Sequence, residues 1–422
     1  MHHLKQFVIA CWAMCVMILR KINGDRQVEI VVATPGTAGS LGDQALLQGI
    51  WAGFARSEGA QLRQLLLPGF ELIPTDPPGL PAKRVTNYSM FGDLKFLWHL
   101  RNARLFCVPG ADVMDGVYDR HQALAYLHMS DLAVRAGVRA RLFGFSFSSR
   151  PSREVVERFK SLSPEVVCCV RDPGSLARFE RMTGRRGALV ADLAFLLEPE
   201  KRAAIALDLS RWITAKHQVL AGTQERPIVI AINANALTGL EKQEVIVDVF
   251  VALIDKLAAR HPNMGFLLIP HDFRSEGSDA SVNPVIHARL EASIQSRTRL
   301  VTPPFDSWDA KALVGECDLL VTGRMHLAVA ALGMGVPVIG IDYNDKFTGL
   351  FSYFNIESLV VTAAEAYAAH GLETLVVQTL PRCDDIKRHL TARRDRVRQL
   401  SRRNFAEFKV DPIGTPALSS VF

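Results

Sequence analysis

The sequence lacks the patterns of a disulfide-rich, zinc-binding or repeat protein. Its seven cysteines include no C-x-x-C pair, and most of them sit inside apolar runs typical of buried strands or helices. No cluster of residues has the spacing of a metal site, and no internal repeat of about 20 to 50 residues is visible. We therefore expect a reduced, metal-free, cytoplasmic protein that is not a solenoid.

The N-terminus carries an apolar stretch, Phe7–Leu19, that is too short to cross a membrane. It has 13 residues, whereas a spanning helix needs about 20. Lys5 precedes it, Arg20 and Lys21 follow it, and no small-residue cleavage site is evident, so a secretory signal is not favoured. We expect residues 1–25 to be a dispensable extension. The alternative is a segment that touches a membrane surface.

Positive charge is concentrated near the C-terminus rather than spread over the chain. Of the net charge of +6, residues 387–403 contribute eight Lys or Arg against one Asp, so the remainder is close to neutral and a nucleic-acid partner is not expected. Residues 384–404 predict an amphipathic helix that docks on the body with its arginines outward. The alternative is peripheral contact with an anionic membrane carrying a lipid-linked glycan. Its apolar positions are Ile386, Leu390, Val397 and Leu400.

The length of 422 residues exceeds what one hydrophobic core supports, so two domains are expected. β-Branched runs alternate with helical periodicity from residue 28 onward, which is typical of parallel sheets. We predict an α/β fold of two Rossmann-like domains facing each other across a cleft. The first spans residues 26–200, the second residues 225–380, and residues 381–422 form the basic helix and tail.

A glycine-rich turn, residues 34–46, leaves the first predicted strand and opens a helix. Its small residues allow backbone N–H groups to approach an anion or a sugar, which makes Gly42 and Asp43 candidates for substrate binding. The spacing is not G-x-G-x-x-G, so a nicotinamide cofactor is poorly supported. A plain tight turn, with Asp43 as a first-turn acid, explains the pattern equally well.

A second strand-to-helix switch carries Arg324 and His326, which fall within the first helical turn. Histidine titrates near neutral pH and can donate or accept a proton, while arginine neutralises an anion. The run that leaves the next strand places Lys346 on the same edge, which adds a second cation. These residues predict a site for an anionic ligand.

Two further candidates also lie at the ends of predicted strands. Arg171 can bind a phosphate or carboxylate in bidentate fashion, although an ion pair to Asp172 or Asp192 is the structural alternative. His271 ends another strand of the second domain and is a reserve acid or base, or a surface histidine.

Taken in order, these segments resemble the polysaccharide pyruvyl transferase family. The resemblance covers about Val28 to Leu350, and the ordered set is more specific than any one motif. Its elements are Gly42-Asp43-x-Ala45, Arg171-Asp172-x-x-Ser175, Asp192-x-Ala194-Phe195, Arg324-x-His326, Gly335-x-Pro337 and Asp345-Lys346.

The resemblance implies a GT-B-like fold and transfer of pyruvyl from phosphoenolpyruvate onto two hydroxyls of a sugar, as in the making of an exopolysaccharide. No cofactor is then expected besides the donor. Our hypothesis makes His326 the acid or base, with Arg324 and Arg171 holding the anionic donor and Lys346 assisting.

Two departures from the family fall in the first domain, which is expected to hold the saccharide acceptor. Ser40 stands where relatives have Asn, and Val108-Pro109-Gly110-Ala111-Asp112 replaces a Gly-Gly-Gly run. Two other interpretations therefore stay open: a GT-B glycosyltransferase that uses a nucleotide sugar, and a non-catalytic glycan-assembly protein of the same fold.

Overall fold

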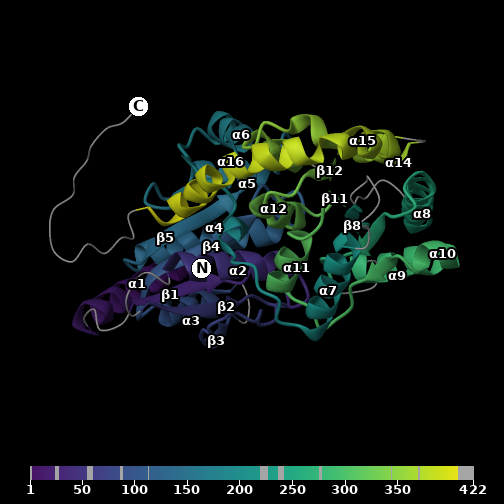
Figure 1. Ribbon diagram of the computed structural model, residues 1–422. Helices are drawn as coiled ribbons and strands as arrows, with labels where there is room; N and C mark the ends of the chain where they lie inside the picture. Colours follow the sequence, from purple (N-terminus) through teal and green to yellow (C-terminus); the bar gives the residue numbers. More distant parts are fainter. Residues whose placement is uncertain are drawn as a thin grey trace.

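The computed structural model describes residues 2–23, 28–54, 60–85, 89–112, 114–218, 227–235, 242–274, 278–343, 345–368 and 371–406. Within these ranges the chain forms two α/β domains that lie against each other, each built around a parallel sheet (Figure 1). The expected pair of Rossmann-like domains is confirmed.

The first domain is built on seven strands with helices on both faces. The strands are β1 (Val28–Ala33), β2 (Ala60–Leu66), β3 (Leu80–Arg84), β4 (Ala103–Ala111), β5 (Arg139–Phe145), β6 (Val167–Val170) and β7 (Ala188–Leu189). Their order in the sheet is β3-β2-β1-β4-β5-β6-β7. The helices are α1 (His2–Asn23), α2 (Leu41–Phe54), α3 (Met90–His99), α4 (Arg120–Arg135), α5 (Arg153–Lys160), α6 (Pro173–Thr183) and the 3-10 helix η1 (Leu193–Leu196).

The second domain is built on six strands. They are β8 (Val229–Asn233), β9 (Gly265–Leu268), β10 (Thr298–Leu300), β11 (Leu319–Thr322), β12 (Val338–Asp342) and β13 (Val360–Thr362), in the order β10-β9-β8-β11-β12-β13. Its helices are α7 (Ala204–Gln218), α8 (Gln243–Arg260), α9 (Asp279–Arg289), α10 (Ala292–Gln295), α11 (Ser307–Val314), α12 (Met325–Met334), α13 (Lys346–Ser352), α14 (Ala363–Tyr367), α15 (Gly371–Thr379) and α16 (Cys383–Arg402). The short 3-10 helices are η3 (Glu357–Leu359), η4 (Leu380–Arg382) and η5 (Arg403–Phe405).

Strand order reverses at equivalent places in the two sheets, between β1 and β4 and between β8 and β11. In open parallel sheets, ligands bind at such switch points, beyond the carboxyl ends of the strands. The central strands β8 and β11 are buried along their whole length, which explains their continuous apolar sequences. Both sheets therefore present a candidate binding edge.

The N-terminal helix α1 packs onto the first domain, where the sequence predicted a dispensable extension. Ile9, Ala13 and Val16 are buried in the main apolar cluster of that domain. The Trp12 indole Nε1 donates to the carbonyl oxygen of Leu94 in α3 at 3.0 Å. Within the described residues, no helix combines the length and apolar character needed to cross a bilayer.

The C-terminal helix α16 runs from the second domain back across the first (Figure 1). Ile386, Leu390 and Val397 are buried. The apolar face of α16 therefore packs against the rest of the protein, as the sequence predicted. At its end the Asn404 side chain accepts a hydrogen bond from the Gly144 backbone N–H at 2.9 Å. This segment therefore ties the two domains together.

The turn after β1 also joins the domains directly. The Leu41 N–H donates to the carbonyl of His271 at 3.3 Å, and the Phe273 N–H donates to the carbonyl of Gly39 at 2.9 Å. Because Gly39 adopts a φ of 95°, glycine is favoured at this contact. The predicted glycine-rich turn is thus part of the domain interface.

Candidate functional site

His326 lies where the two domains meet. It is the second residue of α12, which begins shortly after β11. Its Nε2 atom is 3.6 Å from the Asp192 Oδ2 atom and has no hydrogen-bond partner among the described residues. On its other side the imidazole packs on Gly42, where a Cβ atom would lie 2.5 Å from the imidazole Nδ1. Motifs from opposite halves of the chain therefore meet at one imidazole.

Asp43, the neighbour of Gly42, also faces the second domain. Its Oδ2 atom is 3.9 Å from the Arg274 Nη1 atom, and its backbone N–H donates to the Ser40 hydroxyl at 3.3 Å. Burial raises the pKa of the Asp43 carboxyl, although Arg274 and His326 act in the opposite direction. The structure thus brings Asp43 to the same interface as His326, while its role in substrate binding stays a prediction.

Arg171 is enclosed by protein groups and does not reach open space. Its side chain is 1% exposed, and its Nη1 atom lies 2.9 Å from Asp192 Oδ2. Its Nη2 atom pairs with Asp112, and its Nε atom donates to the Ser146 hydroxyl at 2.6 Å. The structure therefore does not support the donor-binding role expected for Arg171. The structural alternative, an ion pair to Asp192, is present, with Asp112 as a second partner.

His326 and Arg171 together hold Asp192 in its ionised form. Burial alone would raise the pKa of Asp192, but His326 and Arg171 outweigh burial and leave the pKa below its usual value. Asp192 therefore presents a carboxylate to the imidazole, as an orienting group for an acid or base does.

Arg324 and His271 lie beside His326 but are also committed within the protein. Arg324 donates from Nη2 to Asp279 Oδ1 at 2.8 Å and lies 3.2 Å from Asp272 Oδ2. Burial, with His326 and Arg324 nearby, lowers the pKa of His271 to about 3. His271 is thus a neutral, buried histidine near neutral pH rather than the surface histidine that the sequence left open.

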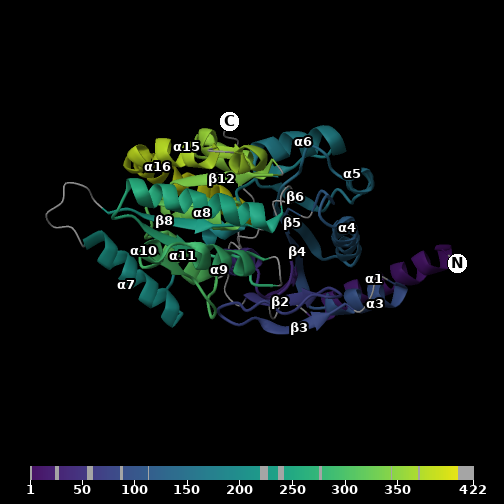
Figure 2. The same ribbon diagram turned by 90° about the vertical axis from the view of Figure 1, so that its right-hand side faces the viewer.

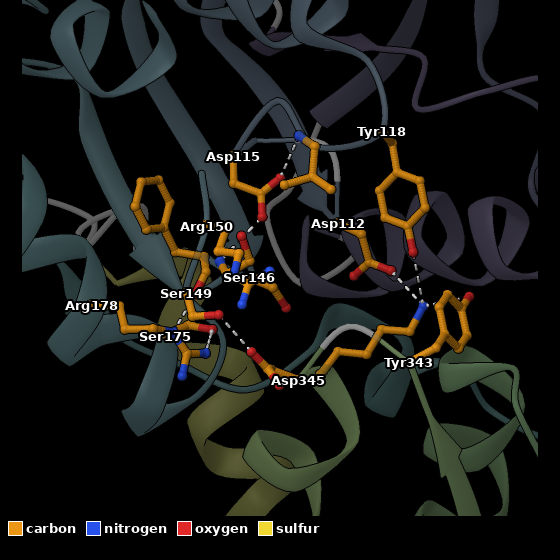
Figure 3. Close-up of a pocket in the computed structure, with 14 residues that line it drawn as sticks. Asp112, Asp115, Tyr118, Ser146, Ser149, Arg150, Ser175, Arg178, Tyr343 and Asp345 are labelled. Atoms are coloured by element: carbon orange, nitrogen blue, oxygen red, sulfur yellow. Dashed lines mark hydrogen bonds and ion pairs between the residues drawn. The ribbon is translucent and has the colours of Figure 1, made fainter. Parts of the chain in front are cut away.

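A cavity of about 420 Å³ opens between the domains, next to this cluster (Figure 3). The first domain contributes most of the lining and the second contributes the segment that follows β12. Lining residues are Asp112, Asp115, Val117, Tyr118, Ser146, Phe147, Ser148, Ser149, Arg150, Ser175, Arg178, Tyr343, Asp345 and Lys346. His326 does not line this cavity; Arg171 and the carboxylates of Asp112 and Asp192 connect it to the cavity wall.

Lys346 is the predicted site residue that reaches the cavity. Its Nζ atom donates to Tyr343 Oη at 2.9 Å, to Asp112 Oδ2 at 3.1 Å and to Tyr118 Oη at 3.4 Å (Figure 3). Burial alone would lower the pKa of Lys346, but Asp112 and the two phenols outweigh burial and raise the pKa above its usual value. The cavity wall therefore contains a permanently charged ammonium group.

Further contacts among the lining residues lie beside Lys346, one of them between the domains and the others within the first domain. The Ser149 hydroxyl donates to Asp345 Oδ2 at 2.9 Å, which links the loop after β5 to the start of α13. Arg178 donates to the Phe147 carbonyl at 2.7 Å and to the Ser175 hydroxyl at 3.3 Å. Within the part of the chain that the structure describes, Arg150 has no ion-pair partner.

Sequence analysis missed several residues that shape this site. Asp112 was noted only as part of an altered segment, although its place directly after β4 is the strand-end signal that singled out Arg171. Tyr343 directly follows β12 and carries the same strand-end signal. Arg150, Arg178 and Tyr118 have no such signal, because they become neighbours only through the packing of separate elements.

Chemically, the cavity suits a ligand with anionic and hydroxyl groups. Lys346, Arg150 and Arg178 supply positive charge, while serine and tyrosine hydroxyls and three carboxylates supply hydrogen-bonding partners for a sugar. No group of three or more His, Cys, Asp or Glu residues suited to a metal ion occurs among the described residues.

Comparison with solved structures identifies the fold. The chain is similar to S. aureus MnaA solved with UDP, with a TM-score of 0.58, 10% identity and coverage of 91% of this chain and 96% of that one. It is also similar to the Neisseria meningitidis UDP-GlcNAc 2-epimerase bound to UDP-GlcNAc, with a TM-score of 0.53, 11% identity and coverage of 86% of this chain and 94% of that one. A ugt transferase from Siraitia grosvenorii in complex with UDP has a TM-score of 0.53 and 11% identity, with coverage of 90% of this chain and 99% of that one. At these identities the likeness shows the GT-B-like fold alone.

Sequence comparison identifies the family. No curated protein matches the chain at a significant level. The polysaccharide pyruvyl transferase family, in contrast, matches residues 42–345, a range that begins at the glycine packed on His326 and ends beside Lys346. The chain therefore belongs to the polysaccharide pyruvyl transferase family, and is a transferase that acts on a saccharide.

Proposed function

We propose that this transferase moves a pyruvyl group from phosphoenolpyruvate onto two hydroxyls of a sugar in a surface or exported polysaccharide. The first hydroxyl oxygen bonds to C2 of the donor while the methylene carbon gains a proton and becomes a methyl group. The second hydroxyl oxygen then displaces phosphate from C2. One hydroxyl proton balances the new methyl hydrogen, the other is released to solvent or to the departing phosphate, and the product is a pyruvate ketal.

The observation that carries the proposal is the position of Lys346. Its ammonium group lies in the wall of a cavity lined by both domains and is held charged by Asp112 and two phenols. Phosphoenolpyruvate carries a phosphate and a carboxylate, and charge-assisted hydrogen bonds to such groups are about twice as strong as neutral ones. Arg150 and Arg178 line the same cavity and supply cations for the second anionic group.

His326 is the proposed acid or base. Its Nε2 atom is unpartnered and faces the Asp192 carboxylate, so Asp192 can orient the ring and stabilise a positive imidazolium. Since Arg171 and Asp112 stand between His326 and the cavity, Arg171 is assigned to holding this carboxylate pair, and proton transfer by His326 requires a shift of the domains that opens the cavity to the imidazole when the donor binds. Arg324 is likewise assigned to positioning the start of α12 through Asp279 rather than to clamping the donor.

The acceptor is proposed to bind on the side of the first domain. Tyr118, Ser146 and Ser149 present hydroxyls there, and Asp115 presents a carboxylate, which are groups that hydrogen-bond sugars. A lipid-linked saccharide is compatible with this opening. The reaction needs no cofactor besides its donor, and we propose a cytoplasmic location because the donor is a phosphorylated metabolite and the cysteines are expected to be reduced.

Thermal-shift titration tests donor identity, because a ligand that binds the native state raises the melting temperature. Phosphoenolpyruvate is compared with UDP- and GDP-sugars on the wild-type protein and on Lys346→Ala. We expect phosphoenolpyruvate to stabilise the wild type but not Lys346→Ala. Stabilisation by a nucleotide sugar alone would replace the proposal with a GT-B glycosyltransferase.

Turnover separates the enzyme from a binding protein of the same fold. Phosphate release from phosphoenolpyruvate is measured with a panel of acceptor glycans, and Lys201→Ala, a change at a partly exposed lysine paired with Glu316, is the matched control. Release that depends on acceptor and is lost in Lys346→Ala supports pyruvyl transfer. Donor binding without release on any acceptor would favour the non-catalytic alternative.

A further inference from the structure

Helix α1 is apolar on the side that faces solvent as well as on the side that it buries. Ile9, Ala13 and Val16 pack into the first domain, whereas Phe7, Met14 and Ile18 are 67%, 53% and 50% exposed. Spacings of seven and four residues put these three side chains on one stripe of the helix. A docked helix of a globular protein normally turns charged residues toward water, so this stripe is unpartnered.

Helix α3 lies beside α1 and extends the same surface (Figure 2). Phe91 is 74% exposed and Trp98 is 42% exposed, and they are seven residues apart on one stripe. The Trp12 and Trp98 ring centroids are 6.2 Å apart, which joins the two helices. We call the exposed residues Phe7, Trp12, Met14, Ile18, Phe91 and Trp98 the α1/α3 face.

Cations lie beside the α1/α3 face at the end of α3. Helix α1 contains no acidic residue, and Asp93, the acidic residue of α3, is buried. The Arg101 guanidinium lies 4.6 Å from the centroid of the Trp98 ring. Lys83, Lys95 and Arg101 lie near His99 at the end of α3, where burial first and then these cations lower the pKa of His99 to about 4.

We propose that the α1/α3 face docks this protein on the surface of an anionic lipid bilayer, independently of the proposed reaction. Exposed Phe, Met and Ile side chains enter the boundary between headgroups and acyl chains, and the tryptophans sit at headgroup level, where aromatic rings with one polar atom are enriched. Lysines and arginines at the rim pair with lipid phosphates. The helix lies on the membrane and does not cross it.

Charge distinguishes a bilayer from a protein partner on this surface. An apolar patch without charge would suit a bilayer or a protein partner equally. Here Asp93 is buried and the charged groups beside the face are cations, so the face is complementary to anionic lipid rather than to a second copy of the same cationic surface. Helix α16 is less suited, because Ile386, Leu390 and Val397 are already buried on the body. Along α16, Cys383–Arg402, all of which the structure describes, no large hydrophobic side chain is exposed beside the arginines.

Vesicle sedimentation with the full chain tests the proposal. Vesicles of phosphatidylcholine alone are compared with vesicles that also contain phosphatidylglycerol, at low and high salt. The test variant combines Phe7→Ser, Met14→Ser, Ile18→Ser and Phe91→Ser, all at exposed positions. The matched control combines Leu207→Ser and Val285→Ser, which are 41% and 42% exposed on the second domain.

We expect the wild type and the control to bind the anionic vesicles. The affinity of the test variant for the same vesicles should fall at least about tenfold. Lys95→Glu should weaken binding to anionic vesicles selectively, and added salt should do the same. Unchanged melting temperatures show that the variants are folded. Every substitution in the test variant is at an exposed site, so the variant is expected to fold. If it does not fold, the single substitutions Phe7→Ser and Phe91→Ser take its place.

Four results would overturn the inference. The first is no binding of the wild type to anionic vesicles, and the second is equal binding by the test variant. The third is a dimeric protein that becomes monomeric in the test variant, which would assign the α1/α3 face to a second copy of the chain. Binding lost on replacing Arg388 and Arg394 of α16, with the α1/α3 face intact, would move the membrane contact to α16.

Discussion

The Nε2 atom of His326 lies 3.6 Å from the Oδ2 atom of Asp192, across the boundary between the two domains. Asp192 follows β7 and His326 opens α12, so the pair exists only when the domains are correctly assembled. Arg171 holds the same carboxylate oxygen at 2.9 Å. A small inward movement of the ring would complete a charge-assisted hydrogen bond, which links the state of the imidazole to the closure of the domains.

Replacing either member of this pair should separate catalysis from donor binding. His326→Gln removes the acid or base and should lower the turnover rate about 10²- to 10⁴-fold. Asp192→Asn keeps the shape but loses the carboxylate, and should lower turnover while changing its pH profile. Both rates are measured as acceptor-dependent release of phosphate from phosphoenolpyruvate.

His128→Gln is the control for His326→Gln, because this histidine pairs with Asp93 and does not line the cavity. Donor stabilisation in the thermal-shift assay should persist in His326→Gln, since Lys346 is unchanged. Full activity in His326→Gln would remove His326 from the mechanism.

Lys346 should contribute to donor affinity rather than to the proton transfers. A hydrogen bond to a charged group contributes about 1.5 to 3 kcal/mol, so Lys346→Ala should raise the Kd for phosphoenolpyruvate about ten- to hundredfold. Lys346→Arg should restore part of the affinity because it keeps the charge. Isothermal titration calorimetry measures both values, and an unchanged Kd in Lys346→Ala would place the donor elsewhere.

Much of the fold was predictable because its strands are buried on both faces. Such strands are continuous apolar runs, as in β1 and β5, and the alternation of such runs with helical periodicity from residue 28 onward predicted the parallel sheets. Edge strands carry a weaker signal: β3 contains Pro81 and follows a proline-rich connection, a pattern that is typical of a loop. Proline is tolerated there because one side of an edge strand has no hydrogen-bonded neighbour. The docking of α1 was missed because its apolar stripes on both sides conceal which face is buried.

The site was predictable as far as strand ends and helix starts reveal it. His326, Gly42, Asp43 and Lys346 all follow strands, and the structure brings them to the domain interface. Pairing between side chains was not predictable: nothing near Arg171 in sequence shows that Asp112 will take its second guanidinium nitrogen. A cation at a strand end therefore indicates an interface but does not establish that a ligand occupies it.

Gly42 should be required for the geometry of His326 rather than for flexibility. In Gly42→Ala the new Cβ atom would lie 2.5 Å from the imidazole Nδ1, so the ring or α2 must move, at a cost of about 1 to 3 kcal/mol. We expect a lower melting temperature together with loss of turnover.

The control for Gly42→Ala is Gly174→Ala, at the second position of α6, where the nearest atom would be 3.4 Å away. Both substitutions fall in the first turn of a helix, so their helix propensities match. Equal effects of the two substitutions would show that the contact with His326 is unimportant.

Lys311 should make stability depend on pH. It lies in α11, and its ammonium group donates to the carbonyl of Leu197 at 2.6 Å and to that of Phe195 at 3.3 Å. Burial lowers the pKa of Lys311 to about 7. Between that value and the ordinary lysine pKa, the unfolded chain holds a proton that the folded chain does not, so unfolding becomes less favourable as pH rises.

The expected slope is at most about 1.4 kcal/mol per pH unit, seen as a melting temperature that rises from pH 7 to pH 8.5. Lys311→Met removes the titrating group and should flatten this slope, even if the unpaired carbonyls lower the absolute stability. Lys201→Met, at a lysine that is 34% exposed and paired with Glu316, should keep the wild-type slope. Because the comparison uses the difference between variants, cysteines and histidines that titrate in the same range cancel. A slope that is the same in Lys311→Met and the wild type would show that Lys311 keeps its proton in the folded protein, held by the carbonyl groups at the start of the connection between the domains.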